Sequence, residues 1–311
     1  MHIYISGSLA YDRIMNFPDN FSNHILPEKL HILNVCFLVQ DLEEKFGGTA
    51  GNIAYSLSLL KEKPVLISQA GSDFQRYQSW MDKHGIALQG VRFIQDVPTA
   101  GAYIITDMAD NQITAFNPGA MNYPCSQTFQ DFSPENSLAI VSPGNLEDMQ
   151  QFPNIYRALD LPFILDPGQN IPAFDGQQLQ NMLKGSRALI VNDYELSLVQ
   201  EATGLEKNEL LNLTGAIITT LGEQGSLVLE RDQEERSVAA AKATKTVDPT
   251  GAGDAFRSGL IKGLTLGMSL HQAARVGSVC ACYAVENKGT QEHYFNTRDF
   301  WQRYEDNYGQ P

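Results

Sequence analysis

The chain has 311 residues, of which 43% are hydrophobic and 19% are charged, as in an ordinary globular protein with a sizeable core. Its formal net charge of −14 argues against a nucleic-acid partner and against binding to an anionic membrane surface. We see no signal-peptide pattern, no transmembrane run and no zinc or disulfide spacing among the four cysteines, so we expect a cytoplasmic location.

The first part of the chain mixes a strand–helix alternation with two insertions. Buried strands are predicted at residues 2–6 and 65–69, and apolar helices at 53–61 and 73–84. Residues 12–44 break this alternation, and we interpret them as an insertion with extended pieces at 13–17 and 35–39. Residues 101–106 and 112–116 alternate around a turn, which predicts a hairpin belonging to the same appendage.

From residue 137 onward the alternation is regular. Strands are predicted at 138–141, 163–166, 188–191 and 216–220, a hairpin at 225–229 and 236–240, and helices at 255–266 and 297–308. This pattern predicts an α/β fold with a doubly wound, mostly parallel sheet. Ligands bind such sheets outside the carboxyl ends of the strands.

A glycine-rich turn at residues 248–256 (Asp-Pro-Thr-Gly-Ala-Gly-Asp-Ala-Phe) is the strongest chemical signal. Backbone N–H groups at a helix N-terminus attract anions, and Gly251 and Gly253 lack a Cβ, so the main chain can approach a phosphate closely. Asp254 would repel an anion unless it has a proton to accept, which fits a general base acting on an attacking hydroxyl. For this motif alone, a glycine-rich loop capped by aspartate is the simpler interpretation.

Polar residues follow the predicted strands of the parallel sheet. The polar residues at or after strand ends are Ser8, Asp12, Asp166, Asn192, Glu195 and Thr220, and Gly222 and Gly225 accompany the last of them. Strand ends are also good helix caps, so each residue alone has a structural explanation. Their accumulation at one edge of the sheet favours a binding site.

Taken together, these motifs resemble one enzyme family. Gly47-Gly48-(x)3-Asn52 and Asp248-(x)2-Gly251-Ala252-Gly253-Asp254 look like the two signatures of the ribokinase-like (PfkB) carbohydrate and nucleoside kinases. Asn192-x-x-Glu195 and Thr220-x-Gly222 match between them, so the resemblance covers essentially the whole chain. Residues 7–12 and 116–121 look most like the bacterial adenosine-kinase-type branch. Residues 71–76 lack the second glycine of the family's Gly-x-Asp-x-x-Gly pattern, which puts a direct sugar contact there in doubt.

The resemblance implies an ATP- and Mg²⁺-dependent kinase that phosphorylates a primary hydroxyl, with the 5′-hydroxyl of adenosine as first choice. Asp254 would be the base, and the N–H groups of Gly251, Ala252 and Gly253 would stabilise the transferring phosphoryl group. The implied acceptor contacts are Ser8, Asp12, Gly47, Gly48, Asn52 and Phe116, with Asp12 and Asn52 on a sugar diol. The implied nucleotide contacts are Asn192, Thr220, Gly222, Gly225, Gly251 and Gly253.

Two metal sites are also implied. Glu195 would organise Mg²⁺ through water together with Asn192, and a helix-capping arrangement of these two residues is the alternative. Asp248 and Thr250, with carbonyls of residues 285–289, resemble a loop that binds a monovalent cation such as K⁺ in many relatives. A plain surface turn is the alternative there.

The resemblance gives the insertions a role. In this family a small β-sheet covers the acceptor and in some members pairs between subunits. Segments at roughly 12–45 and 98–118 would therefore form a lid on a single kinase domain of residues 1–311, acting as a monomer or a lid-mediated homodimer. Tyr11 and Phe116 are candidates for stacking on a nucleobase, whereas Phe37 fits better in the lid's own small core.

Two other functions stay open. One is a sugar kinase of the ribokinase or fructokinase type, and the other is a nucleoside- or nucleotide-binding sensor without turnover. Asp254 argues against the sensor, because binding alone has no use for a carboxylate beside an anion site.

Overall fold

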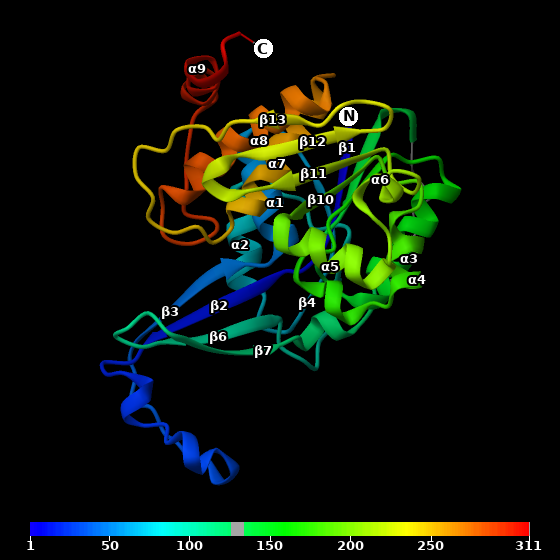
Figure 1. The fold of residues 1–311 in the computed structure, drawn as a ribbon. Helices are drawn as coiled ribbons and strands as arrows, with labels where there is room; N and C mark the ends of the chain where they lie inside the picture. The colour runs from blue at the N-terminus through cyan, green and yellow to red at the C-terminus, as the bar shows by residue number, and fades with distance from the viewer. Residues whose placement is uncertain (126–133, 311) are drawn as a thin grey trace.

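A computed structural model describes residues 1–125 and 134–310 and contains a nine-stranded and a four-stranded sheet (Figure 1). The strand order of the large sheet is β13-β12-β11-β10-β9-β8-β1-β4-β5. All pairings from β5 to β11 are parallel, and the β11–β12 and β12–β13 pairings are antiparallel. The expected doubly wound, mostly parallel α/β fold is confirmed.

The strands of the large sheet are mostly those expected. They are β1 (His2–Ser6), β4 (Val65–Ala70), β5 (Val91–Phe93), β8 (Ser137–Val141), β9 (Phe163–Leu165), β10 (Ala188–Asn192), β11 (Ala216–Thr220), β12 (Ser226–Glu230) and β13 (Arg236–Val238). Strand β5 was not expected, because three residues are too few for a periodic pattern.

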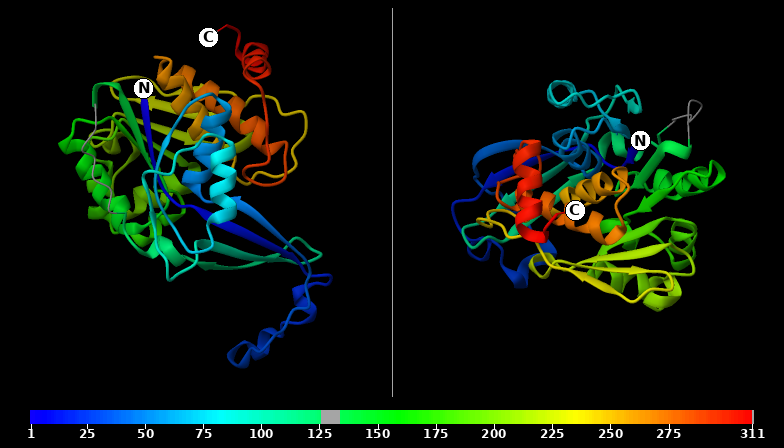
Figure 2. Two further views of the ribbon diagram at one scale, coloured as in Figure 1. Left: turned by 180° about the vertical axis from the view of Figure 1, so that it is seen from behind. Right: turned by 90° about the horizontal axis from the view of Figure 1, so that it is seen from above.

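Helices cover both faces of this sheet (Figure 2). They are α1 (Thr49–Leu59), α2 (Gln75–Lys83), α3 (Leu146–Ala158), α4 (Gly176–Leu183), α5 (Asp193–Thr203), α6 (Lys207–Leu210), α7 (Ala252–Thr265), α8 (Leu270–Val285) and α9 (Thr297–Tyr308). In β8, Leu138 and Ile140 pack with α1, α2, α7 and α8, whereas Ala139 and Val141 pack with α3, α4 and α5. Both side-chain rows of the strand are therefore buried, as in a sheet covered on two sides.

Four strands form the smaller sheet, in the order β3-β2-β6-β7. They are β2 (Ala10–Asn16), β3 (Gln40–Gly47), β6 (Ala100–Thr106) and β7 (Gln112–Asn117). We call this sheet the lid, and it extends from the carboxyl end of β1 away from the large sheet (Figure 1). The segment between β2 and β3 projects still further.

The strand expected at residues 35–39 is wrong. Pairing with β2 begins only at Gln40, and the preceding segment holds two 3-10 helices, Phe21–Asn23 and Pro27–Ile32. Phe37 instead packs its ring against Phe17 and Phe21. The apolar character of residues 35–39 therefore reflects a local aromatic cluster rather than a paired strand.

Two helices start earlier than expected, and the N-termini of both helices lie at the site. Helix α1 starts at Thr49 rather than at residue 53, and α7 starts at Ala252 rather than at residue 255. Their N-cap residues are Gly48 and Gly251, whose φ angles of +88° and +80° favour glycine. Both glycine-rich motifs thus contribute the first helical turn as well as the loop before it.

Candidate active site

A cleft of about 780 Å³ lies between the lid and the carboxyl ends of the parallel strands. Strand-end residues Ser8, Asp166, Asn192 and Thr220 line it, as do Asp12 and Phe116 from the lid and residues 249–254 at the start of α7. A second pocket of about 510 Å³ adjoins it. Residues shared by the two linings are Thr220, Gly222, Pro249, Ala252 and Gly253. The start of α7 therefore stands between two adjacent spaces.

The first turn of α7 offers unpaired backbone donors to these spaces. Within the described residues, the N–H groups of Gly251, Gly253 and Asp254 have no hydrogen-bond acceptor, as is usual for the start of a helix. The N–H of Ala252, in contrast, donates to the carbonyl of Pro249 at 3.1 Å. The N–H of Ala252 is thus already paired, whereas the N–H groups of Gly251 and Gly253 remain available to an anionic ligand.

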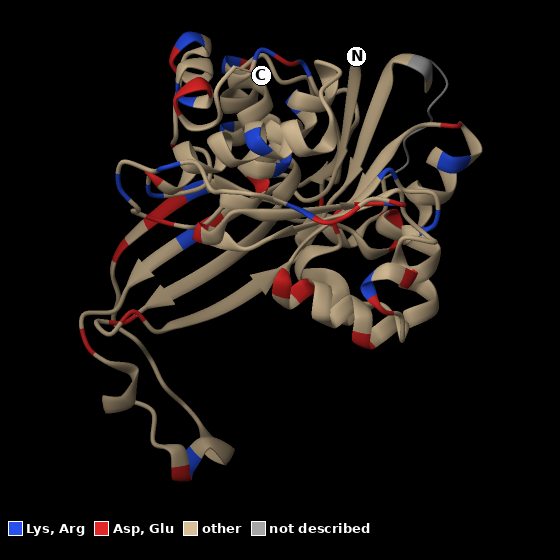
Figure 3. Ribbon diagram, turned by 45° about the horizontal axis from the view of Figure 1, so that its top comes forward, with Lys and Arg blue, Asp and Glu red and all other residues tan. Residues whose placement is uncertain are grey.

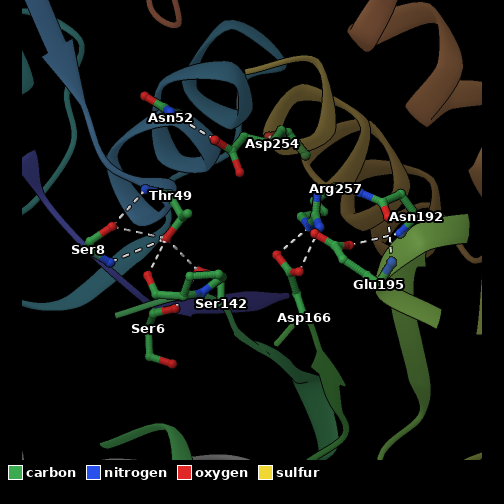
Figure 4. Close-up of polar contacts among 12 residues, drawn as sticks. Ser6, Ser8, Thr49, Asn52, Ser142, Asp166, Asn192, Glu195, Asp254 and Arg257 are labelled. Carbon is green, nitrogen blue, oxygen red and sulfur yellow. Dashed lines mark hydrogen bonds and ion pairs between the residues drawn. The ribbon is translucent and has the colours of Figure 1, made fainter. Parts of the chain in front are cut away.

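Asp254 stands at the third position of α7, partly buried in the cleft. Asn52 Nδ2 donates to its Oδ2 at 2.8 Å (Figure 4). Burial raises the pKa of Asp254, although the nearby Arg257 guanidinium and the Asn52 hydrogen bond act in the opposite direction. A carboxylate with a raised pKa is a better proton acceptor than an ordinary aspartate.

A hydrogen-bond network fixes the orientation of Asn52. Gln291 Nε2 donates to Asn52 Oδ1 at 3.0 Å, and Trp80 Nε1 donates to Gln291 Oε1 at 2.9 Å. The hydroxyl of Tyr77 donates to the carbonyl of Gly47 at 2.8 Å and also accepts a hydrogen bond from Gln291. Tyr77, Trp80 and Gln291 were not expected from the sequence, because they come from α2 and the segment after α8 and belong to no local motif.

Asp12 enters the cleft from lid strand β2. Within the described part of the chain, its carboxylate accepts no hydrogen bond. Burial, together with the negative charge of Asp254, raises the pKa of Asp12 to about 6. A Cβ on Gly47 would come within 2.4 Å of Asp12 Oδ2, so glycine at this position leaves room for the carboxylate.

Phe116 and Tyr11 lie in different environments. Asp12 pairs across the lid with Ala102, and Ala102 pairs with Phe116, so these three residues share one face of the sheet. Tyr11 precedes Asp12 and must face the other way. Its ring is buried against Phe46, and its hydroxyl donates to the carbonyl of Asp73. The expectation that Tyr11 stacks on a ligand is therefore wrong, whereas Phe116 lines the cleft.

Ser8 lies just after β1 and Gly48 just before α1, and contacts between these two segments bring them together. The Ser8 Oγ accepts a hydrogen bond from the N–H of Thr49 at 3.1 Å, and Thr49 Oγ1 donates to the carbonyl of Pro143 at 2.7 Å (Figure 4). A Cβ on Gly48 would come within 2.5 Å of the Ser8 carbonyl oxygen. These contacts hold the start of α1 against the sheet, on the cleft side.

Asn192 and Glu195 form a helix-capping box at the start of α5, which was the alternative to a role in binding Mg²⁺. Asn192 Oδ1 accepts from the N–H of Glu195 at 2.7 Å, and Glu195 Oε2 accepts from the N–H of Asn192 at 2.8 Å. Both residues nevertheless line the cleft at the start of α5. Within residues 1–125 and 134–310 there is no cluster of three or more His, Cys, Asp or Glu side chains suited to holding a metal.

Asp166 and Arg257 form a buried ion pair on the cleft floor. Asp166 Oδ1 accepts from Arg257 Nη2 at 2.6 Å, and Oδ2 pairs with Nε (Figure 4). Burial raises the pKa of Asp166 to about 7, even though the guanidinium acts to lower it. Asp166 was expected at the site as a strand-end residue, whereas Arg257 was not, because in the sequence it looks like an ordinary helix position.

Asp248 ties the glycine-rich loop to the segment after α8. Its Oδ1 accepts from the N–H of Thr250 at 2.9 Å, and its Oδ2 accepts from the N–H of Gly289 at 3.0 Å. Although burial acts in the opposite direction, these hydrogen bonds lower the pKa of Asp248. Lys45 Nζ, from lid strand β3, donates to the nearby carbonyl of Lys288 at 2.9 Å.

Comparison with known proteins identifies this arrangement. Residues 15–297 match the family described as pfkB family carbohydrate kinase. The chain belongs to this family. It is therefore a kinase, a phosphotransferase with an alcohol group as acceptor, and the family expected from the motifs is confirmed.

Similar proteins cover nearly the full length of this kinase. A nucleoside kinase of Methanocaldococcus jannaschii is 27% identical over 291 residues, which are 92% of this chain and 90% of the relative. The solved structure of Burkholderia thailandensis nucleoside kinase in complex with inosine is 36% identical, with a TM-score of 0.86 over 99% of this chain and 98% of that one. The same nucleoside kinase in complex with ADP-inosine is 38% identical, with a TM-score of 0.85 over 99% of this chain and 96% of that one.

Across the part of the kinase that the structure describes, we find no helix with the length and apolar character needed to cross a lipid bilayer.

Proposed function

We propose that this kinase transfers the γ-phosphoryl group of ATP to the 5′-hydroxyl of a purine nucleoside. The observation that carries the proposal is that Asp12 and Phe116 both line the cleft and share one face of the lid, with Ala102 between them in the strand register. Neighbouring strands lie about 4.8 Å apart, so Asp12 and Phe116 start from backbones about 10 Å apart. A ribose with an attached base fills that span better than a monosaccharide alone.

In this pose Asp12 holds the ribose diol and Phe116 stacks on the base. The carboxylate of Asp12 accepts no hydrogen bond within the described residues, so both of its oxygens are available to hydroxyl groups. The small side chain of Ala102 leaves room for the ligand between Asp12 and Phe116. Phe116 is 51% exposed, and Met121 adds a flexible apolar surface to the same cleft.

Asp254 then accepts the proton of the 5′-hydroxyl as that oxygen attacks the γ-phosphorus. Asn52 orients the carboxylate, and the free N–H groups of Gly251 and Gly253 face the charge that develops on the phosphoryl oxygens. Asn52 is already engaged with Asp254 and Gln291, so we assign its main role to orienting the base rather than to gripping the diol. Ser8, Gly47 and Gly48 shape the acceptor site through the contacts described above.

ATP occupies the second pocket in this proposal. Phe256, Ala281 and Val285 give that pocket an apolar wall suited to adenine, and Gly222 and Gly225 also line it. Thr220, Gly222 and Gly253 lie where the two spaces meet, beside the start of α7. The phosphates would thus reach a helix N-terminus, which attracts anions. The Burkholderia thailandensis relative solved with ADP-inosine supports such an adjacent pair of ligands.

Two cations complete the proposal. Asn192 and Glu195 would hold Mg²⁺ through water, which fits a metal that keeps several waters and binds through few carboxylates and substrate phosphates. The Mg²⁺ ion would neutralise phosphate charge. The loop of Asp248 and Thr250 with residues 285–289 is the candidate K⁺ site, supported by the hydrogen bond from Gly289 that brings the two segments together.

Both adenosine and inosine fit the proposed acceptor class. Adenosine is the first choice from the sequence, and inosine is the ligand of the Burkholderia thailandensis relative. Gln169 brings an amide group to the cleft, and an amide can pair with either the amino or the oxo group of a purine. We therefore propose that both nucleosides are phosphorylated, in the cytoplasm as expected from the sequence.

The test is a coupled ADP-release assay with adenosine, inosine, ribose and fructose, each with and without K⁺. We expect kcat/KM for a purine nucleoside to exceed that for ribose or fructose at least tenfold, because base–aromatic stacking is worth about 1–3 kcal/mol. A clear preference for a free sugar would support the sugar-kinase alternative. If no ADP is released with any of these four acceptors, the result would favour the alternative of a binding sensor without turnover.

A further inference from the structure

The Asp166–Arg257 ion pair has no role in the proposed reaction so far. Asp166 follows β9 and is 1% exposed, and Arg257 lies on α7 and is 9% exposed. Removing two charges from water costs several kcal/mol each, so an apolar pair of similar volume would serve stability as well or better. The raised pKa of Asp166, at about 7, is consistent with that cost. Stability alone therefore does not explain the pair.

The geometry leaves one end of the guanidinium free. Asp166 Oδ1 accepts a hydrogen bond from Nη2, and Asp166 Oδ2 forms a close ion pair with Nε without hydrogen-bond geometry, so the carboxylate lies against one edge of the guanidinium and restricts its orientation. Among the residues that the structure describes, none accepts a hydrogen bond from Nη1. Arg257 lines the main cleft, so this nitrogen is the part of the group that is left for a ligand.

The free nitrogen lies under the anion-binding turn. Helical side chains point back toward the N-terminus, which carries the guanidinium of Arg257 from the second turn of α7 toward the first. A Cβ on Gly253 would come within 2.5 Å of Nη1. Gly253 therefore makes room for the guanidinium, and a full positive charge adds to the partial charge of the helix N-terminus.

We propose that Arg257 is a further catalytic residue, whose Nη1 contacts the phosphoryl group in transit, and that Asp166 is the positioning residue that aims it. This inference rests on the proposed function. The bond from the acceptor oxygen to the γ-phosphorus forms, the bond to the ADP oxygen breaks with its electron pair leaving on ADP, and Asp254 takes the acceptor proton. Arg257 stays protonated and donates to the phosphoryl oxygens, where fixed positive charge is most effective.

The decisive variant replaces the whole pair, as Asp166→Leu with Arg257→Met. It leaves no unpaired buried charge, so we expect a Tm at or above that of the wild type. In single-turnover quench experiments with ATP and inosine, the phosphoryl-transfer rate should fall about 100-fold, while calorimetric Kd values for ADP and inosine change less than threefold. A purely structural pair predicts a rate within tenfold of wild type in this double variant, and that result would overturn the proposal. So would a large loss of ADP or inosine affinity with an unchanged rate.

A second variant decides the question if the double variant does not fold. Arg257→Lys keeps the ion pair with Asp166, but an ammonium cannot hold a carboxylate bidentately and also present a fixed second nitrogen. We expect a rate loss of tenfold or more, and a smaller loss would overturn the proposal. Arg231→Lys is the control, because Arg231 binds the carbonyl of Leu211 outside both pockets. If the ADP-release assay shows that the acceptor is a sugar, the rates of the variants are measured with that sugar instead of inosine. The proposal about the acceptor and the proposal about Arg257 can therefore fail independently.

Discussion

Two carboxylates of the cleft, Asp254 and Asp12, differ in what surrounds them. Asp254 is held by Asn52, whose orientation is set by Gln291, whereas Asp12 is left without a donor among the described residues. An oriented carboxylate suits proton transfer, and a free carboxylate suits a ligand with two hydroxyls. The roles proposed for the two residues follow from this difference.

Replacing the proposed base tests the chemistry at Asp254. Asp254→Asn should lower kcat by roughly 10²–10⁴, the usual worth of general-base catalysis, while the Kd of ATP stays within a few-fold. The matched control is Asp193→Asn, an exposed aspartate that lines the same cleft. Steady-state kinetics and calorimetry make the comparison. Near-normal turnover in Asp254→Asn would remove the base assignment.

The raised pKa of Asp12 predicts a pH-dependent acceptor affinity. With a pKa of about 6, Asp12 is ionised at pH 7.5 and mostly protonated at pH 5, where it loses acceptor capacity. The KM for the nucleoside should therefore rise about tenfold between pH 7.5 and pH 5. Asp12→Asn should have a high KM without this pH dependence. A wild-type KM that stays flat down to pH 5 would contradict the assignment.

The same pKa also predicts how stability changes with pH. Because the folded-state pKa of Asp12 lies above the ordinary aspartate value, the native state binds more protons between about pH 4 and 6. Its contribution to the free energy of unfolding therefore decreases as the pH rises through this range. Asp12→Asn should gain stability relative to wild type at pH 8 and not at pH 4. Thermal unfolding at both pH values checks this, and an equal difference at both would contradict it.

Among the secondary-structure elements, the lid strands separate a row of side chains that faces the cleft from the row behind it. Phe116 and Ile113 lie on the same strand, β7, but three positions apart, so they face opposite sides of the lid. Phe116→Ala should raise the nucleoside KM about 10- to 100-fold through lost stacking and leave the KM for ribose nearly unchanged. Ile113→Ala is the matched control and should change neither value. Equal effects of both substitutions would mean that Phe116 acts through lid stability.

The lid strands and the glycine-rich motifs were predictable from the sequence. Which side chains face the cleft, and where the helices after the glycines start, were not. Period-two alternation found the lid strands near Asp12 and Phe116, but it did not decide which of Tyr11 and Asp12 faces the cleft, because that depends on how the lid meets the large sheet. Residues 35–39 misled the prediction, since an aromatic cluster and a strand have the same local composition. The starts of α1 and α7 were placed too late, because the glycines that precede them adopt positive φ angles just before the first turn.

At the scale of the whole molecule, the site lies where residues far apart in the sequence converge. Asn52, Asp254 and Gln291 come from three segments and meet through hydrogen bonds of about 3 Å, so no local motif could have predicted Gln291. The whole chain is acidic, with 36 Asp and Glu against 22 Lys and Arg, and Figure 3 shows both signs mixed over the described ribbon. In the proposed site, an anionic nucleotide would therefore depend on the local field at the start of α7. The single kinase domain, the oligomeric state and the K⁺ requirement stay predictions.

The most direct test of the account is the identity of the phosphorylated product. The kinase is incubated with ATP, Mg²⁺ and inosine, and with adenosine in parallel, and the product is examined by phosphorus NMR with proton coupling. The account predicts a nucleoside 5′-monophosphate, whose phosphorus couples to the two C5′ protons, in an amount equal to the ADP released. A phosphate on the 2′- or 3′-oxygen would contradict it, and so would ADP release without any phosphorylated nucleoside.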